Sequence, residues 1–335
     1  MSALFPCCPS KLLNQHAQKV GHTNKTRRER MAASVTAVAV DDGITKEQEL
    51  KQTTVVQLTE EQELKRARAE VWLWRWNLAM GCMHLLWAII CLAMGLGSGR
   101  AAQFKVKAIT SYPTWGDFGP QPATQLRYLV PFTALTSGFA WMSAAAHFLV
   151  LAKFPIYLRD LRNGINQFRW FEYAASSSLM IVLIAMLFGV WDVQTLFQLG
   201  SVNACMNFFG YSHEVQNTVG KKVDWSNFIF GCFAGLVPWC TVISYAADGN
   251  ATSDGIPAFV WAILVVYIFF FLMFPLNMVL QYAQIGAWYR DEAAGFPGGG
   301  YYFGEKVYQV LSLSAKTLLL WLVVGGTNQP NAYTQ

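Results

Sequence analysis

The chain has 335 residues, of which 54% are hydrophobic and only 13% are charged, and its formal net charge is +5. Soluble domains carry about 25% charged residues, so this composition excludes an ordinary soluble protein. Apolar runs of about 20 residues recur and match a hydrocarbon core of roughly 30 Å. The composition therefore predicts an integral membrane protein in a lipid bilayer, and the small positive charge gives no reason to expect a nucleic-acid partner.

Residues 1–70 are polar and contain the basic cluster "KTRRER". We expect a largely disordered cytoplasmic tail here, with an organelle-targeting segment as the alternative. Within it, "LTEEQELKRARAE" is rich in helix formers, with Thr59 as a candidate N-cap. Cys7 and Cys8 are candidates for lipidation. The other five cysteines lie in apolar runs, and no cysteine spacing suggests a zinc site, so we expect no metal.

Residues 71–326 hold seven apolar segments, which predict an all-α membrane protein built as a seven-transmembrane-helix bundle. Residues 327–335 would then form a short extracellular or lumenal tail. Prolines inside three of the segments are compatible with a bundle, because neighbouring helices re-satisfy the backbone. The predicted spans are residues 76–96, 128–151, 170–191, 193–212, 227–246, 256–284 and 307–324.

Two connections between the predicted spans are long. In the first, residues 97–127, "FKVKAITSY" alternates like a strand and "PTWGDFGP" is rich in turn residues. This pattern predicts a small β-hairpin in the first extracellular loop. The connection before the seventh span, "DEAAGFPGGGYYFGEK", is glycine-rich and is expected to be an extended loop.

Charge fixes the expected orientation. Seven spans place the two ends of the chain on opposite sides of the membrane. With the N-terminus in the cytoplasm, most of the 25 lysines and arginines lie inside, as the positive-inside rule favours. The motif at Asn250 would then face outward as a candidate glycan site, although this motif often occurs by chance. The outer side would hold Arg100, Lys105, Lys107 and Arg127.

A lysine, Lys316, lies in the middle of the seventh span, in "SLSAKTLLLW". A cation at mid-membrane costs about 2.5–3.5 kcal/mol on insertion scales, so a partner is expected, and Glu172 of the third span is the obvious one. One interpretation is an ion pair that only fixes helix packing. The sharper one uses the amine as a nucleophile that forms a Schiff base with an aldehyde. Aromatic residues crowd the last spans and suit a polyene, which points to retinal on Lys316 with Glu172 as counterion.

Polar residues at helical spacing accompany these charges. Ser312 lies one turn before Lys316, and Ser176 lies one turn after Glu172. In the same way Ser143 precedes His147 in the second span, and His84 lies in the first. Each histidine could simply bond a neighbouring helix, and the alternative is a hydrated proton-accepting cluster.

The end of the fourth span carries His213 and Glu214, which could relay protons on the cytoplasmic side. The position eleven residues after Glu172 is Leu183, so the proton-donor carboxylate of the better-known microbial pumps is missing there.

Long stretches of the sequence resemble the heliorhodopsin family, which is rhodopsin-like in fold. They are "RWFEYAASSSLMIVLIAML", "NACMNFFGYSHE", "AGLVPW", "PLNMVLQY" and "GEKVYQVLSLSAKTLLLW", within residues 70–325. The resemblance implies all-trans retinal bound to Lys316, the counterion Glu172 and a cytoplasmic N-terminus. It also implies a homodimer to which the first outer loop contributes. The long tail and the glycine-rich loop depart from the family's pattern.

The resemblance also implies roles for further residues. A polar cluster near the Schiff base would contain His84, Ser143 and His147, with Ser176 and Ser312 as its neighbours. The retinal pocket would be formed by residues of the third to sixth spans, namely Tyr173, Asn203, Met206, Gly210, Pro238, Trp239, Phe270 and Phe271.

These observations favour a light-sensing photoreceptor rather than an enzyme. Light would isomerise the retinal, the Schiff-base proton would move to the polar cluster, and a cytoplasmic partner of unknown identity would read the change in helix packing. The alternative is a light-gated or light-driven proton or ion transporter. A third hypothesis, a light-switched regulator of another protein, overlaps the first. A hormone-type receptor is disfavoured, because the lysine and carboxylate would have no role.

Overall fold

The computed structural model describes residues 60–217, 222–252, 255–289 and 300–329. The predictions for the tail before residue 60, including Thr59, Cys7 and Cys8, therefore lie outside the described residues. The chain divides into two units, and the described part of the smaller one ends at Trp76. This part is the start of helix α3 (Glu60–Leu96), where Arg66 pairs with Glu70 at 3.2 Å. Residues 60–70, the stretch of helix formers for which Thr59 is the candidate N-cap, are helical.

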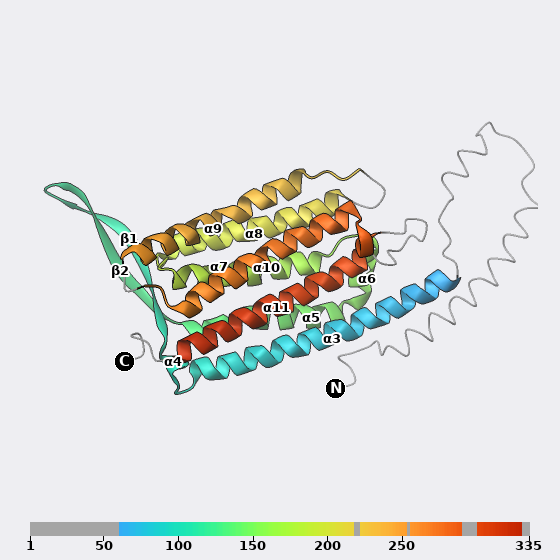
Figure 1. Ribbon diagram of the computed structural model, residues 1–335, viewed down its shortest axis with the longest axis horizontal. Coiled ribbons are helices and arrows are strands. Elements are labelled where there is room, and N and C mark those ends of the chain that lie inside the picture. Colours follow the sequence, from blue (N-terminus) through green and yellow to red (C-terminus); the bar gives the residue numbers. More distant parts are fainter. Residues whose placement is uncertain (1–59, 218–221, 253–254, 290–299, 330–335) are drawn as a thin grey trace, which may run out of the picture. The chain divides into compact units, whose positions relative to one another are not determined.

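The larger unit is the predicted bundle. Its helices run side by side, and the hairpin β1–β2 extends from one end (Figure 1). Short elements join them: α4 (Arg100–Gln103), α6 (Phe154–Arg162) and the single turn η1 (Gly286–Trp288). Besides the part of α3 from Asn77 onward, the long helices are α5 (Phe132–Ala152), α7 (Gln167–Leu187), α8 (Val193–Gln216), α9 (Ser226–Thr252), α10 (Ala258–Ala283) and α11 (Gly300–Asn328).

Within the described residues, six helices are long and apolar enough to cross a membrane, namely α3, α5, α7, α9, α10 and α11. The seventh, α8, has 24 residues and so a length of roughly 36 Å, which also suffices. It carries more polar residues, among them Asn203, Asn207 and Glu214, and all three are buried inside the bundle. The chain is a multi-pass membrane protein with the seven helices that the sequence predicts.

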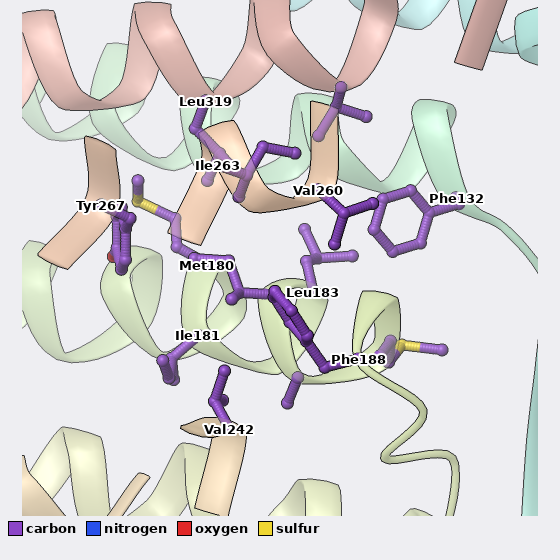
Figure 2. Close-up of a cluster of buried hydrophobic side chains, with 14 of the residues drawn as sticks. Phe132, Met180, Ile181, Leu183, Phe188, Val242, Val260, Ile263, Tyr267 and Leu319 are labelled. Carbon is purple, nitrogen blue, oxygen red and sulfur yellow. The ribbon is translucent and has the colours of Figure 1, made fainter. Parts of the chain in front are cut away.

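Helix α7 lies at the centre of the packing, with contacts to α5, α8, α9 and α10, while α11 packs against α10 and α5. Figure 2 shows a buried apolar cluster around the second half of α7, with Met180 on the side of Ile263 of α10 and Leu319 of α11 and Ile181 on the opposite side, toward Val242 of α9. Leu319 is one turn beyond Lys316, so this cluster closes the bundle on one side of that lysine.

The predicted hairpin is present. Strands β1 (Lys105–Gly116) and β2 (Gly119–Pro131) pair antiparallel over their whole length. Asp192 ties the hairpin to the bundle, because its side chain accepts hydrogen bonds from the backbone N–H of Ser111 at 2.8 Å and of Thr195 at 3.0 Å. The second bond caps the start of α8.

Several helix ends differ from the predicted spans by a few residues, and two of these differences move residues into another element. Residues 128–131 end strand β2 rather than start the second span, because they pair with residues 105–108. Residues 300–306, expected in the glycine-rich loop, form the first turns of α11. The start of α11 is helical because Tyr301, Tyr302 and Glu305 are buried against the bundle. The candidate glycan residue Asn250 lies in the last turn of α9.

Candidate functional site

The centre of the site is an ion pair between α11 and α7. Lys316 Nζ donates hydrogen bonds to Glu172 Oε1 at 2.8 Å and to Ser312 Oγ at 2.8 Å. The side chains of Lys316 and Glu172 are only 4% and 8% exposed. Both charges are thus removed from solvent, and each depends on the other for compensation. The contact predicted between these two charged residues is present.

Helix α5 adds the next polar groups. Ser143 Oγ donates to Glu172 Oε1 at 2.6 Å, so the carboxylate is held from two sides. One turn further, His147 Nδ1 lies 2.9 Å from Asn77 Oδ1 of α3. The ring of His147 stacks on that of His84, with 5.6 Å between the centroids. In the described residues, His84 Nε2 is buried without a hydrogen-bond partner. The predicted polar cluster is therefore assembled beside Glu172.

A mostly apolar cavity of about 240 Å³ is lined by Lys316 and Ser312 of α11 together with residues of α7, α8, α9 and α10. Among the predicted pocket residues, Tyr173, Met206, Gly210, Phe270 and Phe271 line it, and Ser176 lines it as well. A Cβ at Gly210 would collide with the ring of Trp170, so only glycine leaves room for that ring at the wall. Such a cavity suits an apolar ligand, and the amine of Lys316 in its wall can form a Schiff base with an aldehyde.

Asn203, Pro238 and Trp239 are not among the lining residues. The amide of Asn203 instead donates to Ser177 Oγ at 2.7 Å, between α7 and α8. Trp239 packs behind the wall against Phe271, at 5.4 Å between ring centroids. The predictions chose the correct helices but missed which turn faces the cavity. Lining residues that the sequence did not indicate include Trp170, Asn207, Tyr267 and Tyr308.

A second buried group of charges lies where α7 and α11 begin. The guanidinium of Arg169 is bonded to the carboxylates of both Glu214 and Glu305. Glu214 also accepts from Tyr301 Oη at 3.0 Å, and Glu305 accepts from Tyr157 Oη at 3.0 Å. Side-chain exposure is 3% or less for all three charged residues. We call Arg169, Glu214 and Glu305 the charged trio.

Of this trio, only Glu214 is among the candidate residues predicted from the sequence. Arg169 lies just before the predicted third span, and Glu305 lies in the stretch predicted to be a glycine-rich loop. The sequence feature that indicates their burial is the group of aromatic residues in "RWFEY" and "GYYFGEKVY", because such side chains pack against the bundle and cover the neighbouring charges. His213 points elsewhere, with its ring 4.5 Å from that of Tyr282.

A membrane bundle of seven helices, with a buried lysine–carboxylate pair at the head of an aromatic cavity, defines a protein of the rhodopsin type. The comparison with known families agrees, since residues 73–328 match the model of the Heliorhodopsin family. The chain belongs to the heliorhodopsin family, and is thus a light-sensing retinal protein of the rhodopsin type. No curated protein matches the sequence.

Proposed function

We propose that the chain is a photoreceptor in which all-trans retinal is bound covalently to Lys316 and Glu172 is the counterion. The observation that carries this proposal is the Lys316–Glu172 pair, at 2.8 Å, at the head of the apolar cavity. Bound there as a Schiff base, retinal would supply visible absorption and photoisomerisation. The chain's own residues hold the charge: Glu172 keeps the lysine nitrogen protonated, and Ser143 and Ser312 orient the two groups.

The attachment is tested with Lys316→Ala in membranes supplied with retinal. We expect complete loss of the visible absorption band, because no other amine lies at the head of the cavity in the described residues. Lys306→Ala, which removes another lysine of the same helix, is the matched control and should keep the band. A pigment that survives in Lys316→Ala would disprove the assignment.

The counterion is tested with Glu172→Gln. A nearby carboxylate stabilises a positive charge localised on the lysine nitrogen. Its removal should therefore shift the absorption maximum to longer wavelength, because light moves positive charge away from that nitrogen. The result is read from the absorption spectrum, and an unchanged maximum would assign the counterion role to another residue.

We further propose that the light-induced change is read as a conformational signal and that no ion is pumped. In support, the charged trio cross-links α7, α8 and α11 and closes the bundle on the side where the N-terminal tail is expected. Photocurrent under voltage clamp, with Lys316→Ala as the blank, tests this. A current lost in the blank would instead establish the transporter alternative, in which Glu214 is the candidate relay.

The side on which the tail lies and the oligomeric state are also proposals. The charge distribution favours a cytoplasmic N-terminus and an extracellular or lumenal C-terminus. The proposed homodimer uses the hairpin, because strand β2 exposes Leu126, Tyr128 and Leu129 to the extent of 52%, 68% and 53%. Cross-linking of single cysteines placed on β2 in membranes tests the dimer, and tags at the two termini test the orientation. A cytoplasmic signalling partner would be sought with the tail.

A further inference from the structure

One face of α11 carries a row of polar side chains from the charged trio to the lysine. Glu305, Gln309, Ser312 and Lys316 follow each other at spacings of four, three and four residues, so they lie on one side of the helix. Gln309 Nε2 donates to Glu305 Oε1 at 3.0 Å, and Lys316 Nζ donates to Ser312 Oγ at 2.8 Å. Hydrogen bonds thus join the first two residues of the row to each other, and the last two residues to each other.

Between these two bonded pairs, the series of hydrogen bonds along the row is broken at the buried amide oxygen of Gln309. Gln309 Oε1 has no hydrogen-bond partner in the described residues, although the side of the helix on which it lies is closed to solvent. A buried amide oxygen without a partner costs roughly 1–3 kcal/mol, so such an atom usually has a bound water. The orphaned oxygen points to a ligand that can donate a hydrogen bond.

A small cavity of about 40 Å³ occupies this place. A water needs roughly 10–15 Å³ of such volume and two to four polar partners, so the cavity has room for about three waters. Most of the residues around it are polar, and they include Glu172 of the lysine pair and Glu305 of the charged trio. The polar residues that line it are Asn77, His147, Tyr157, Asn166, Arg169, Glu172, Tyr173, Glu305, Gln309 and Ser312.

The two carboxylates of the trio differ in their relation to this cavity. Glu305 lines it, whereas Glu214 does not. The trio has one cation and two carboxylates, so a proton that enters it neutralises a buried negative charge. Besides Arg169 of the trio, the other charged or titratable groups facing the cavity are Glu172, paired with Lys316, His147, and the phenols of Tyr157 and Tyr173.

We propose that Ser312 and water in this cavity join Lys316 to Glu305, and that Glu305 takes up the proton released at the lysine nitrogen after illumination. In this step an N–H bond at Lys316 breaks, the Ser312 hydroxyl and each water accept one proton and pass on another, and an O–H bond forms at Glu305. Charge is conserved: the nitrogen and Glu305 both become neutral, while Glu172 stays a carboxylate. The transfer stops inside the protein, on the side closed by the trio. The proposal rests on the proposed function, because light must act at Lys316.

The first test concerns water alone and uses the full chain prepared without retinal. A density map that resolves ordered solvent should show water within hydrogen-bond distance of Gln309 Oε1 and Ser312 Oγ. An empty cavity would overturn the path. This test does not require the pigment, so its result holds even if Lys316→Ala shows that retinal is not attached to Lys316.

The second test uses light-minus-dark infrared spectra of the pigment with labelled glutamate carboxyls. We expect a protonated-carboxyl band that is absent in Glu305→Gln, together with a change of at least about tenfold in the rate of proton return to the lysine. A band that persists in Glu305→Gln overturns the proposal, and its loss in Glu214→Gln would then assign the proton to Glu214. If Glu305→Gln does not fold, Glu305→Asp keeps a carboxyl and should shift the band, whereas an unshifted band overturns the assignment.

Discussion

Removal of the cation of the charged trio should destabilise the bundle far more than removal of an exposed arginine. Arg169→Met keeps much of the apolar volume but leaves Glu214 and Glu305 without their partner. Removing one partner of a buried ion pair costs about 3–5 kcal/mol, because the remaining charge stays buried. The side chains concerned are 3%, 0% and 2% exposed, so the full effect applies. For a bundle of this size the melting temperature should fall by roughly 6–20 °C.

The matched control is Arg159→Met on α6. Arg159 pairs with Asp160 at 2.9 Å, but its side chain is 68% exposed. Water screens this pair from the arginine side, and Asp160 also accepts a hydrogen bond from Gln167 Nε2 at 2.7 Å, which the variant keeps. The loss should therefore be about 0–1 kcal/mol, and the melting temperature should change by less than about 4 °C. Both variants are compared by the helical circular dichroism signal on heating in detergent. Equal losses in the two variants would refute the reasoning.

A rescue separates charge from packing in the same assay. Arg169 also lies over the ring of Tyr308, at 4.1 Å from its centroid, so the methionine variant loses a cation–π contact as well. Arg169→Met combined with Glu214→Gln and Glu305→Gln leaves no stranded carboxylate, and it should regain most of the lost stability. If the triple variant melts as low as the single one, the aromatic contact and not the charge accounts for the loss.

Two further predictions concern the hairpin and the cavity. Asp192→Ala should cost about 1 kcal/mol through loss of the α8 cap. Bonds from the N–H groups of Thr195 and Ser111 lower the pKa of Asp192. The wild-type attachment is therefore complete above about pH 4 and lost as pH falls through the lowered value, which hydrogen exchange of the hairpin amides would show. Gly210→Ala should force Trp170 into the cavity, cost about 1–3 kcal/mol and shift the absorption maximum, whereas Gly325→Ala, with open space, should not.

The helices and the central pair could be predicted from the sequence because each has a strong local signal. Apolar runs must match the bilayer thickness, which identifies the seven helices even where α8 is less apolar than the rest. A lone lysine inside such a run requires a partner, and few carboxylates lie inside the other runs. The contact between Lys316 and Glu172 followed from this shortage of partners.

Which residues line the cavity and form the trio depends on how each helix is rotated about its axis and on how deep each residue lies in the bundle. A single sequence does not encode either of these. Asn203 and Asn207 are one turn apart on the same face of α8, yet only Asn207 reaches the cavity. Similarly, Glu305 follows a glycine-rich stretch and resembles a loop residue until the packing of Tyr301 and Tyr302 shows that it is buried. Side-chain burial at the ends of spans is set by neighbouring helices rather than by local composition.

Helix α11 links the two charged sites mechanically as well as through the polar cavity. Lys316 and Glu305 are eleven residues apart, or roughly 16 Å along the helix axis. Between them, Tyr173 of α7 donates from Oη to the backbone oxygen of Tyr308 at 3.0 Å, which fixes the two helices to each other. A shift of α11 at Lys316 must therefore either carry α7 with it or break this bond. If α7 moves with α11, the bond of Arg169 on α7 to Glu214 on α8 is disturbed. If the Tyr173 bond breaks instead, the bond of Arg169 to Glu305 on α11 is disturbed. A change at the lysine thus alters the charged trio, at the end of the bundle where the proposed cytoplasmic partner would bind.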